Sequence, residues 1–198
     1  MASTLMNRLS LSDTFSLGPR YADRHVGYWL QKRCGASNKL LKNFLRGVST
    51  PKREIVFKVE EGARFTDVLG NGELILIVSQ KFVDVLSSAG FLGWHTYPIK
   101  LYDKSNTLIS KPVFGIGITG RAGPIDKKRG VVWTKLPHSK RRVPGRNGLY
   151  FNTSNWDGSD IFMLEDANYV LITRRVAEAL EKAKLSGFKA KPVSDVKF

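Results

Sequence analysis

The sequence has little of what most catalytic centres are built from. It holds one cysteine, Cys34, which excludes an internal disulfide and any zinc site made of cysteine thiolates. Its three histidines, His25, His95 and His138, are scattered, and no carboxylate pair or nucleophile motif accompanies them. We therefore expect a protein that is not an enzyme and that binds no metal and no cofactor.

A long apolar run is also absent. None approaches the roughly 20 residues that a transmembrane helix needs. Residues 1–20 are rich in serine and poor in acids, but they lack the apolar core of a secretory signal. We interpret them as a loosely docked terminus, with organelle targeting as the alternative. A single cysteine is compatible with a reducing compartment, so we expect a cytoplasmic protein.

Acidic residues are few, with 17 Asp and Glu against 32 Lys and Arg and a formal net charge of +15. Residues 1–58 and residues 121–146 each carry a net charge of +8, and the rest of the chain is close to neutral. This distribution favours a scaffold that presents a basic surface to an acidic protein, a nucleic acid or an anionic membrane. A basic but unspecialised surface is the alternative.

The stretch from residue 74 to residue 99 predicts a strand, a helix and a second strand. Leu74–Val78 is an apolar run of the length of a buried strand, and Ser79 after it is a good helix N-cap. Gly90 is typical of a helix end, because glycine tolerates the left-handed conformation. An extended piece then runs to Pro98. The apolar face of the predicted helix is formed by Phe82, Val85, Leu86 and Ala89.

The same pattern returns 94 residues later without a gap. The matching glycine and proline positions favour a true internal repeat over two pieces that look alike because the same physics shapes both. The second apolar helix face consists of Val176, Ala179, Leu180 and Ala183. The matched positions outside the helices include Ser79 and Thr173, Gly93 and Gly187, and Pro98 and Pro192.

Shorter patterns fill the rest of the chain. Asn38–Leu45 predicts an amphipathic helix with Asn38 as its N-cap, and the alternation in residues 54–60 predicts a strand. The apolar spacing within residues 65–69 predicts a helical turn. The string GIGITG at residues 115–120 matches the dinucleotide-binding fingerprint, but no helical period follows it. Glycines in a strand or its turn are therefore the favoured interpretation.

The basic segment from Ile125 to Arg146 is the main candidate binding region. Its prolines and glycines predict that much of it is loop. Cations with an aromatic ring among them can bind phosphates and stack on a base, although a solvated loop has the same composition. The candidate partner-binding residues are Lys127, Lys128, Arg129, Trp133, Lys140, Arg141, Arg142 and Arg146.

These patterns together predict an α+β fold. We expect a central sheet on which two related strand-helix-strand units pack their helices, plus a basic N-terminal segment. We divide the chain into residues 1–53, a partly helical basic segment, and residues 54–198, an α+β domain.

A set of patterned positions in residues 54–198 carries a family resemblance. The set consists of Thr66-Asp67, Val78-Ser79, Gly93, Pro98, Asp160–Phe162 and Gly187. With these positions the segment resembles the immunity-protein domain of bacterial polymorphic and contact-dependent toxin systems, in the superfamily that includes the double-CXXCG type. The resemblance implies a protein that binds a cognate toxin in the cytoplasm and blocks its active site. The paired Cys-x-x-Cys motifs of that type are missing here, so no zinc is implied.

The charge adds one expectation to this resemblance. Immunity proteins against nucleases tend to be acidic, whereas a net charge of +15 favours an acidic partner surface. The leading hypothesis is therefore a non-enzymatic protein that neutralises a toxin with an acidic surface. The alternative is a nucleic-acid-binding protein that uses residues 121–146. The sequence does not indicate an oligomeric state.

Overall fold

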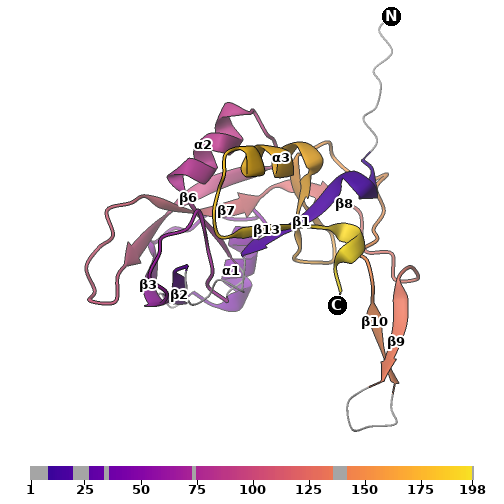
Figure 1. The fold of residues 1–198 in the computed structure, drawn as a ribbon, viewed down its shortest axis with the longest axis horizontal. Coiled ribbons are helices and arrows are strands. Elements are labelled where there is room, and N and C mark those ends of the chain that lie inside the picture. Colours follow the sequence, from indigo (N-terminus) through magenta and orange to yellow (C-terminus); the bar gives the residue numbers. More distant parts are fainter. Residues whose placement is uncertain (1–8, 20–26, 34–35, 73–74, 136–141, 198) are drawn as a thin grey trace, which may run out of the picture.

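The computed structural model has the mixed α+β fold that the sequence predicts, with three α-helices among its described residues. Its strands form two larger sheets and a separate two-stranded ribbon, where the sequence analysis predicted one central sheet (Figure 1). The apolar faces of two helices are buried between these two larger sheets. The structure describes residues 9–19, 27–33, 36–72, 75–135 and 142–197.

The larger sheet has six strands in the order β2-β3-β6-β7-β5-β4. Strands β3 and β6 are parallel, and the other neighbours are antiparallel. Gly115 and Gly117 of GIGITG lie in β7 and Gly120 begins β8 (Gly120–Ala122), so the predicted strand interpretation is confirmed. The strands are β2 (Trp29–Lys32), β3 (Ile55–Glu61), β4 (Val68–Leu69), β5 (Leu76–Ser79), β6 (Trp94–Tyr102) and β7 (Val113–Ile118).

The smaller sheet has five strands in the order β13-β1-β12-β11-β8. Strand β1 comes from the N-terminal part of the chain, yet it lies between β12 and β13 and is antiparallel to both. The C-terminal strands therefore depend on an N-terminal strand to join them. The strands are β1 (Thr14–Pro19), β8 (Gly120–Ala122), β11 (Ile161–Leu164), β12 (Val170–Thr173) and β13 (Phe188–Pro192).

The two sheets contain units with the same arrangement of strands. We call β4, β5, α2, β6 and β7 the first unit, and β11, β12, α3, β13 and β1 the second unit. In each, the helix connects two strands that flank a third, antiparallel strand. The order β6-β7-β5-β4 in one sheet thus matches the order β13-β1-β12-β11 in the other.

The helices of the two units begin where the sequence predicts. Helix α2 (Gln80–Ser88) follows Ser79, whose hydroxyl accepts a hydrogen bond from the Phe82 N–H at 3.2 Å. It is followed by Gly90, which has a φ of 65°. Helix α3 (Arg174–Lys182) follows Thr173, but the Thr173 side chain makes no capping hydrogen bond.

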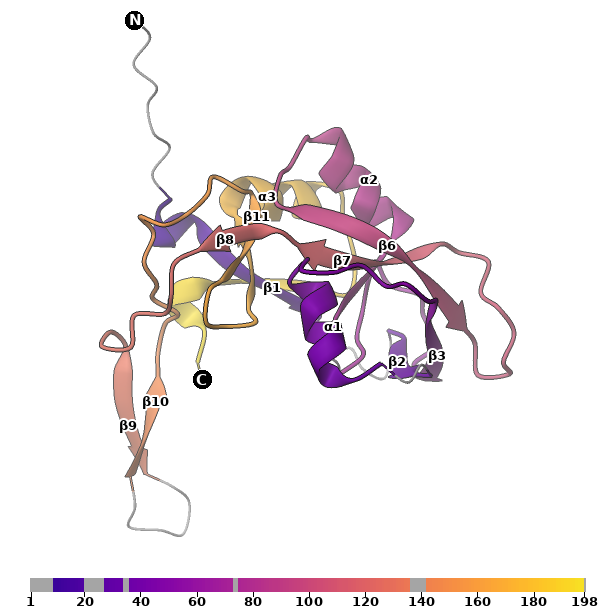
Figure 2. The ribbon, with the colours of Figure 1, turned by 180° about the vertical axis from the view of Figure 1, so that it is seen from behind.

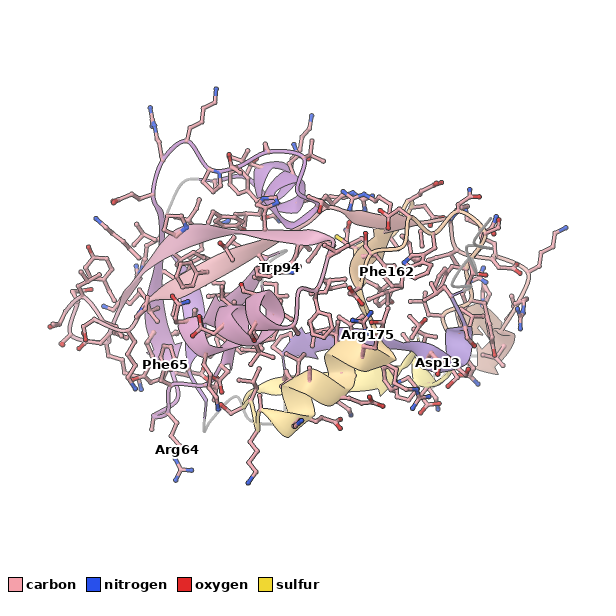
Figure 3. All side chains as sticks on the ribbon, turned by 90° about the horizontal axis from the view of Figure 1, so that it is seen from above. Asp13, Arg64, Phe65, Trp94, Phe162 and Arg175 are labelled. Carbon is pink, nitrogen blue, oxygen red and sulfur yellow. The ribbon has the colours of Figure 1, made fainter. Side chains whose placement is uncertain are left out.

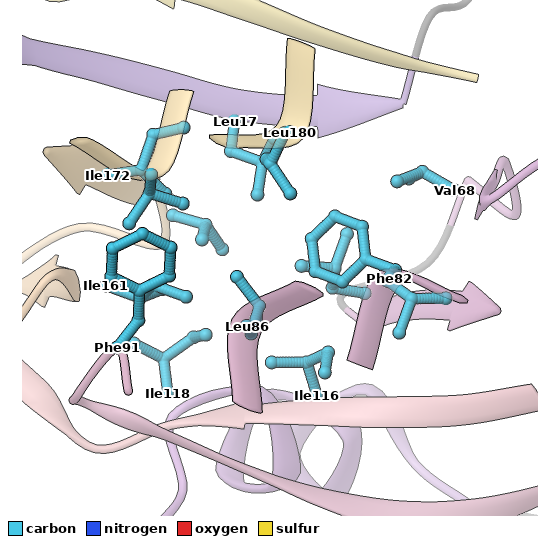
Figure 4. Packing of buried hydrophobic residues seen from close by; sticks show 14 of the residues in the cluster. Leu17, Val68, Phe82, Leu86, Phe91, Ile116, Ile118, Ile161, Ile172 and Leu180 are labelled. Atoms are coloured by element: carbon cyan, nitrogen blue, oxygen red, sulfur yellow. The ribbon is translucent and has the colours of Figure 1, made fainter. Parts of the chain in front are cut away.

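The main hydrophobic core lies between the two sheets and contains the inner faces of α2 and α3 (Figure 4). Phe82 and Leu86 of α2 are buried against it, as is Leu180 of α3. Ile116 lines the core from the first unit and Ile172 from the second, and both are buried. Both units therefore share this core, and each sheet also has a further cluster of buried residues on its other face.

Helix α1 (Asn38–Leu45) covers the opposite face of the six-stranded sheet (Figure 2). Phe44 packs on Tyr97 of β6, with ring centroids 5.9 Å apart. The N-cap is Ser37, whose hydroxyl accepts from the Leu40 N–H at 3.3 Å, so the prediction of Asn38 as N-cap is wrong by one residue. The residue before the first helical turn has the extended backbone that a cap requires.

The N-terminal third is part of both sheets. Strand β1 belongs to the sheet of the second unit, and β2 pairs with β3 of the first sheet. The boundary predicted between residues 1–53 and residues 54–198 therefore crosses both sheets. Strands β1 and β2 lie before it, and the strands with which they pair lie after it. Two short 3-10 helices, η1 (Leu11–Asp13) and η3 (Val193–Asp195), lie close to each other near the chain ends.

Tertiary pairing overrides local pattern at two further places. The helical turn predicted within residues 65–69 is wrong, because Val68 and Leu69 form β4 and pair with Val78 and Ile77. The sequence predicts that the strand ends at Pro98, but β6 continues past it to Tyr102.

In the described part of the chain, no helix has both the length and the apolar character required to cross a bilayer.

The basic segment forms an antiparallel hairpin, where the sequence analysis predicted mostly loop. Strands β9 (Val131–Lys135) and β10 (Arg142–Arg146) pair with each other and with neither larger sheet. The hairpin projects from the body in both Figure 1 and Figure 2. Pro144 is tolerated because a two-stranded ribbon leaves one edge of each strand unpaired. The run from Val131 to Thr134, which is mostly β-branched, favours the extended conformation.

Candidate binding surface

Asp67, just before β4, joins the two units. Its Oδ1 accepts a hydrogen bond from the Ser79 hydroxyl at 2.8 Å. Its Oδ2 accepts from both the backbone N–H and the hydroxyl of Ser186, each at 2.8 Å, in the loop between α3 and β13. Partial burial raises the pKa of Asp67, but the hydrogen bonds from Ser186 and Ser79 outweigh it and hold the pKa below its ordinary value of 3.8.

Asp160, just before β11, makes the reciprocal connection. Its Oδ1 accepts from the Thr173 hydroxyl at 3.3 Å, and its Oδ2 accepts from the Leu92 N–H at 3.2 Å. Leu92 lies in the loop between α2 and β6 of the first unit. The Arg175 guanidinium of α3 (Figure 3) lies 3.7 Å from the same Oδ1. Asp67 of the first unit therefore binds the loop after α3, and Asp160 of the second unit binds the loop after α2.

Two glycines allow these loops to approach so closely. A Cβ on Gly93 would lie 2.1 Å from the Ile161 carbonyl oxygen, and a Cβ on Gly187 would lie 2.4 Å from that of Val68. Both glycines have positive φ values, 97° and 78°. Most of the residues that carry the family resemblance thus serve the junction between the units. They include Thr66, Asp67, Ser79, Gly93, Asp160 and Gly187.

Two arginines outside the predicted binding residues, Arg46 and Arg121, have structural roles. The Arg46 guanidinium, at the end of α1, donates to the carbonyl oxygens of Leu164 and Ala167 at 3.1 and 3.0 Å. The Arg121 guanidinium donates to the carbonyl oxygens of Arg46 and Ile118. Burial lowers the pKa of Arg121, and the neighbouring charge of Arg46 lowers it further. These two charges hold α1 against the second sheet rather than facing a partner.

The base of the β9–β10 hairpin is held by its own polar contacts. The Asp126 carboxylate accepts from the backbone N–H groups of Lys128 and Arg129 at 2.9 and 3.3 Å. The Arg146 guanidinium donates to the carbonyl oxygens of Asp126 and Arg129 at 3.3 and 3.2 Å. The Arg129 guanidinium lies over the Tyr150 ring, 4.2 Å from its centroid. Two of the predicted binding residues, Arg129 and Arg146, therefore also fix the hairpin base.

The remaining predicted residues differ in what the structure describes. Lys127 and Lys128 are exposed beside this base. The backbone register places Trp133 opposite Pro144 and Arg142 opposite Lys135 on the hairpin. Lys140 and Arg141 lie outside the described residues. The hairpin thus brings six of the eight predicted residues into one projecting element with its base.

Sequence reasoning missed the two residues that organise this base, Asp126 and Tyr150. An aspartate directly before a Lys-Lys-Arg run is a signal for side-chain capping of the following turn. No sequence signal connects Tyr150 with Arg129, because their contact depends on the hairpin between them. Among the described residues, no group of three or more His, Cys, Asp and Glu side chains could hold a metal ion.

Two comparisons with known proteins, one with family models and one with curated proteins, give no match. No protein-family model matches the chain. No curated protein matches it either.

Proposed function

We propose that this is a non-enzymatic binding protein whose basic β9–β10 hairpin engages an acidic protein surface. The observation that carries the proposal is the projection of the hairpin from the body without pairing to either larger sheet. An element outside the core stabilises the fold little, so its length and charge are better explained by contact with a partner. Its cations would steer an acidic partner and speed association.

The construction of the hairpin base suits this role. Arg129 is stacked on Tyr150, and Arg146 is bonded to two carbonyl oxygens, so neither side chain is free to sample many rotamers. Ordering such side chains before binding reduces the entropy lost on association. Lys127 and Lys128 remain exposed next to them and supply charge for the encounter.

We infer that the partner is a toxin and that this chain acts as its immunity protein in the cytoplasm. The support is the resemblance of residues 54–198 to immunity domains, together with the junction that the resembling residues form. A hairpin that projects from the body of the protein is also a suitable shape for entering an active-site cleft. A cleft lined by carboxylates would match its positive charge.

A nucleic acid is the second candidate partner, and one observation favours it. The major groove of B-DNA admits a two-stranded β-ribbon, and β9–β10 is such a ribbon with basic residues along it. The segment concerned is the one predicted, residues 121–146. Binding of this kind would weaken steeply with salt, because each phosphate contact releases counterions.

The test uses the product of the gene adjacent to the one that encodes this chain. Expressed alone, that product should be toxic, and it should form a tight one-to-one complex with this protein. Replacing Lys127 and Lys128 by alanine should lower the association rate about tenfold at low salt. The Lys140→Ala, Arg141→Ala, Arg142→Ala variant should do the same.

A matched control removes two charges elsewhere. Lys189→Ala with Lys191→Ala, on β13, gives the same net charge as the Lys127 and Lys128 variant, and its association rate should be near that of the wild type. Equal slowing in both variants would show a general charge effect and would contradict a role for the hairpin. A harmless neighbouring product, combined with a salt-sensitive gel shift on DNA or RNA, would favour the nucleic-acid function instead.

A further inference from the structure

A cavity of about 460 Å³ lies beside α1, between that helix and the segment from Ser49 to Ile55. Helix α1 lies away from the β9–β10 hairpin (Figure 2), so the cavity beside α1 is separate from that hairpin. Its volume falls within the range of small-molecule sites in proteins. Nothing in the proposed function of the hairpin uses it.

The inner part of the cavity is apolar. Phe44 and Leu40 contribute from α1, and Ile55 contributes from the start of β3. Phe44 and Ile55 are buried, whereas Leu40 is 40% exposed on a helix whose other apolar residues face the core. An apolar ligand placed here would remove the Leu40 side chain from water, which is favourable.

The outer part of the cavity carries positive charge. Lys52 and Arg53 line it and are exposed. Glu54 also lines it, but the Lys100 ammonium is bound to its carboxylate at 2.6 Å. In the described ranges, neither Lys52 nor Arg53 has an acidic partner. The charge facing a ligand is therefore positive.

One polar group in the wall lacks a partner. The Ser49 hydroxyl oxygen is shielded from solvent and makes no hydrogen bond, although Ser49 lines the cavity. A buried hydroxyl without a partner is costly, and such groups are uncommon in folded proteins. A turn of the Ser49 side chain to another staggered rotamer would aim this hydroxyl at the cavity, where a ligand oxygen would accept its hydrogen bond.

We propose that this cavity binds an amphipathic carboxylate, a small molecule with an apolar tail and one anionic head. The tail packs on Leu40, Phe44 and Ile55. The carboxylate lies between Lys52 and Arg53, and one of its oxygens accepts a hydrogen bond from the Ser49 hydroxyl. This chemistry satisfies the apolar wall, the unpaired cations and the unpartnered hydroxyl at once, which a neutral or cationic ligand of the same length does not.

The test measures binding of decanoate to the full-length protein by isothermal titration calorimetry, below the micellar concentration of the probe. Decyltrimethylammonium and acetate serve as probes that lack the anionic head or the tail. Decanoate should bind, and both controls should bind at least tenfold more weakly. Lys52→Ala with Arg53→Ala should weaken decanoate binding roughly tenfold or more, since hydrogen bonds to charged groups are among the stronger ones.

Two further variants separate a site from general surface binding. Leu40→Trp fills the cavity from an exposed position and should abolish binding while the protein stays folded, as far-ultraviolet circular dichroism would show. Lys39→Ala with Lys42→Ala removes two exposed α1 charges that do not line the cavity and should leave decanoate affinity within about twofold. Absence of decanoate binding, or equal affinity for decyltrimethylammonium, would overturn the proposal. So would an equal loss of decanoate affinity in the Lys39 and Lys42 variant and in the Lys52 and Arg53 variant.

Discussion

In the first unit the central strand, β7, follows β6 directly in the chain, whereas in the second unit the central strand, β1, comes from the N-terminal part. The pairing is nevertheless the same, with the central strand antiparallel to both neighbours in each sheet. The difference shows that strand geometry, and not chain continuity, defines the unit. A strand of suitable length and pattern completes the sheet from either end of the sequence.

The junction between the units is reciprocal but not equal. Asp67 accepts three hydrogen bonds at 2.8 Å, from Ser79 and Ser186. Asp160 is more buried and accepts two longer ones, from Thr173 and Leu92. The first unit also caps its helix with Ser79, whereas Thr173 does not cap α3. These inequalities let each side of the junction be tested against the other.

The largest effect is expected at the two junction glycines. Gly93→Ala and Gly187→Ala each combine a positive φ with a Cβ inside contact distance of a carbonyl oxygen of the other unit. Each should lower the free energy of unfolding by more than about 2 kcal/mol, with Gly93→Ala the worse because its clash is closer. Urea denaturation followed by circular dichroism measures both.

Gly90→Ala is the matched control for these glycines. Gly90 has a φ of 65°, but nothing lies within 4 Å of a Cβ placed there. Its substitution should cost only about 1 kcal/mol, from backbone strain alone. Equal losses at Gly90 and Gly93 would show that the close approach of the loops contributes nothing to stability.

A medium effect is expected at the helix caps. Ser79→Ala removes both the bond from the Phe82 N–H and the bond to Asp67, and should cost about 1 kcal/mol or slightly more. Thr173→Ala removes only the 3.3 Å bond to Asp160 and should cost roughly half as much. Thermal and urea unfolding of the two variants, with Thr173→Ser as control, would reveal the difference. A larger loss at Thr173 would reverse the comparison.

The smallest effect is a pH dependence at Asp67. Its pKa is lowered in the folded protein, so its contribution to stability is present above the ordinary value of 3.8 and is lost as the pH falls through the lower folded value. Wild-type protein should therefore be more stable than Asp67→Asn at about pH 6, and the gap should narrow at about pH 3. Urea midpoints at the two pH values measure the gap. A difference in stability that is the same at both pH values would show that ionisation of the Asp67 carboxylate does not stabilise the fold.

Local signals predicted the parts of the fold that depend on local physics. Ser79 as N-cap, Phe82 and Leu86 on the buried face of α2, and Gly90 after its end are each predicted from neighbouring residues. Ala89, predicted on the same face, is exposed because the helix ends there. The pairing of β1 with β12 and β13 was not predicted, because no sequence pattern near Thr14–Pro19 indicates which distant strands pair with it. Strand β4 was not predicted for the same reason, because its two residues are a strand only through their pairing with β5.

The candidate surface shows the same division. The composition of residues 121–146 was sufficient to select the basic segment, but prolines and glycines suggested a loop where Val131–Lys135 and Arg142–Arg146 form a hairpin. The cavity beside α1 left no sequence signal, because Leu40, Lys52 and Ile55 meet only in the fold. Charge can be counted along a chain, whereas a cavity exists only between elements.

The position of β1 has a consequence for synthesis. Of the described strands it leaves the ribosome first, yet its two neighbours, β12 and β13, leave last. The first unit can pair all its strands while translation continues. In contrast, both edges of β1 stay unpaired until β12 and β13 have been synthesised. During that interval it is open to incorrect partners. Final folding of the second unit thus begins only when the C-terminal strand has been released.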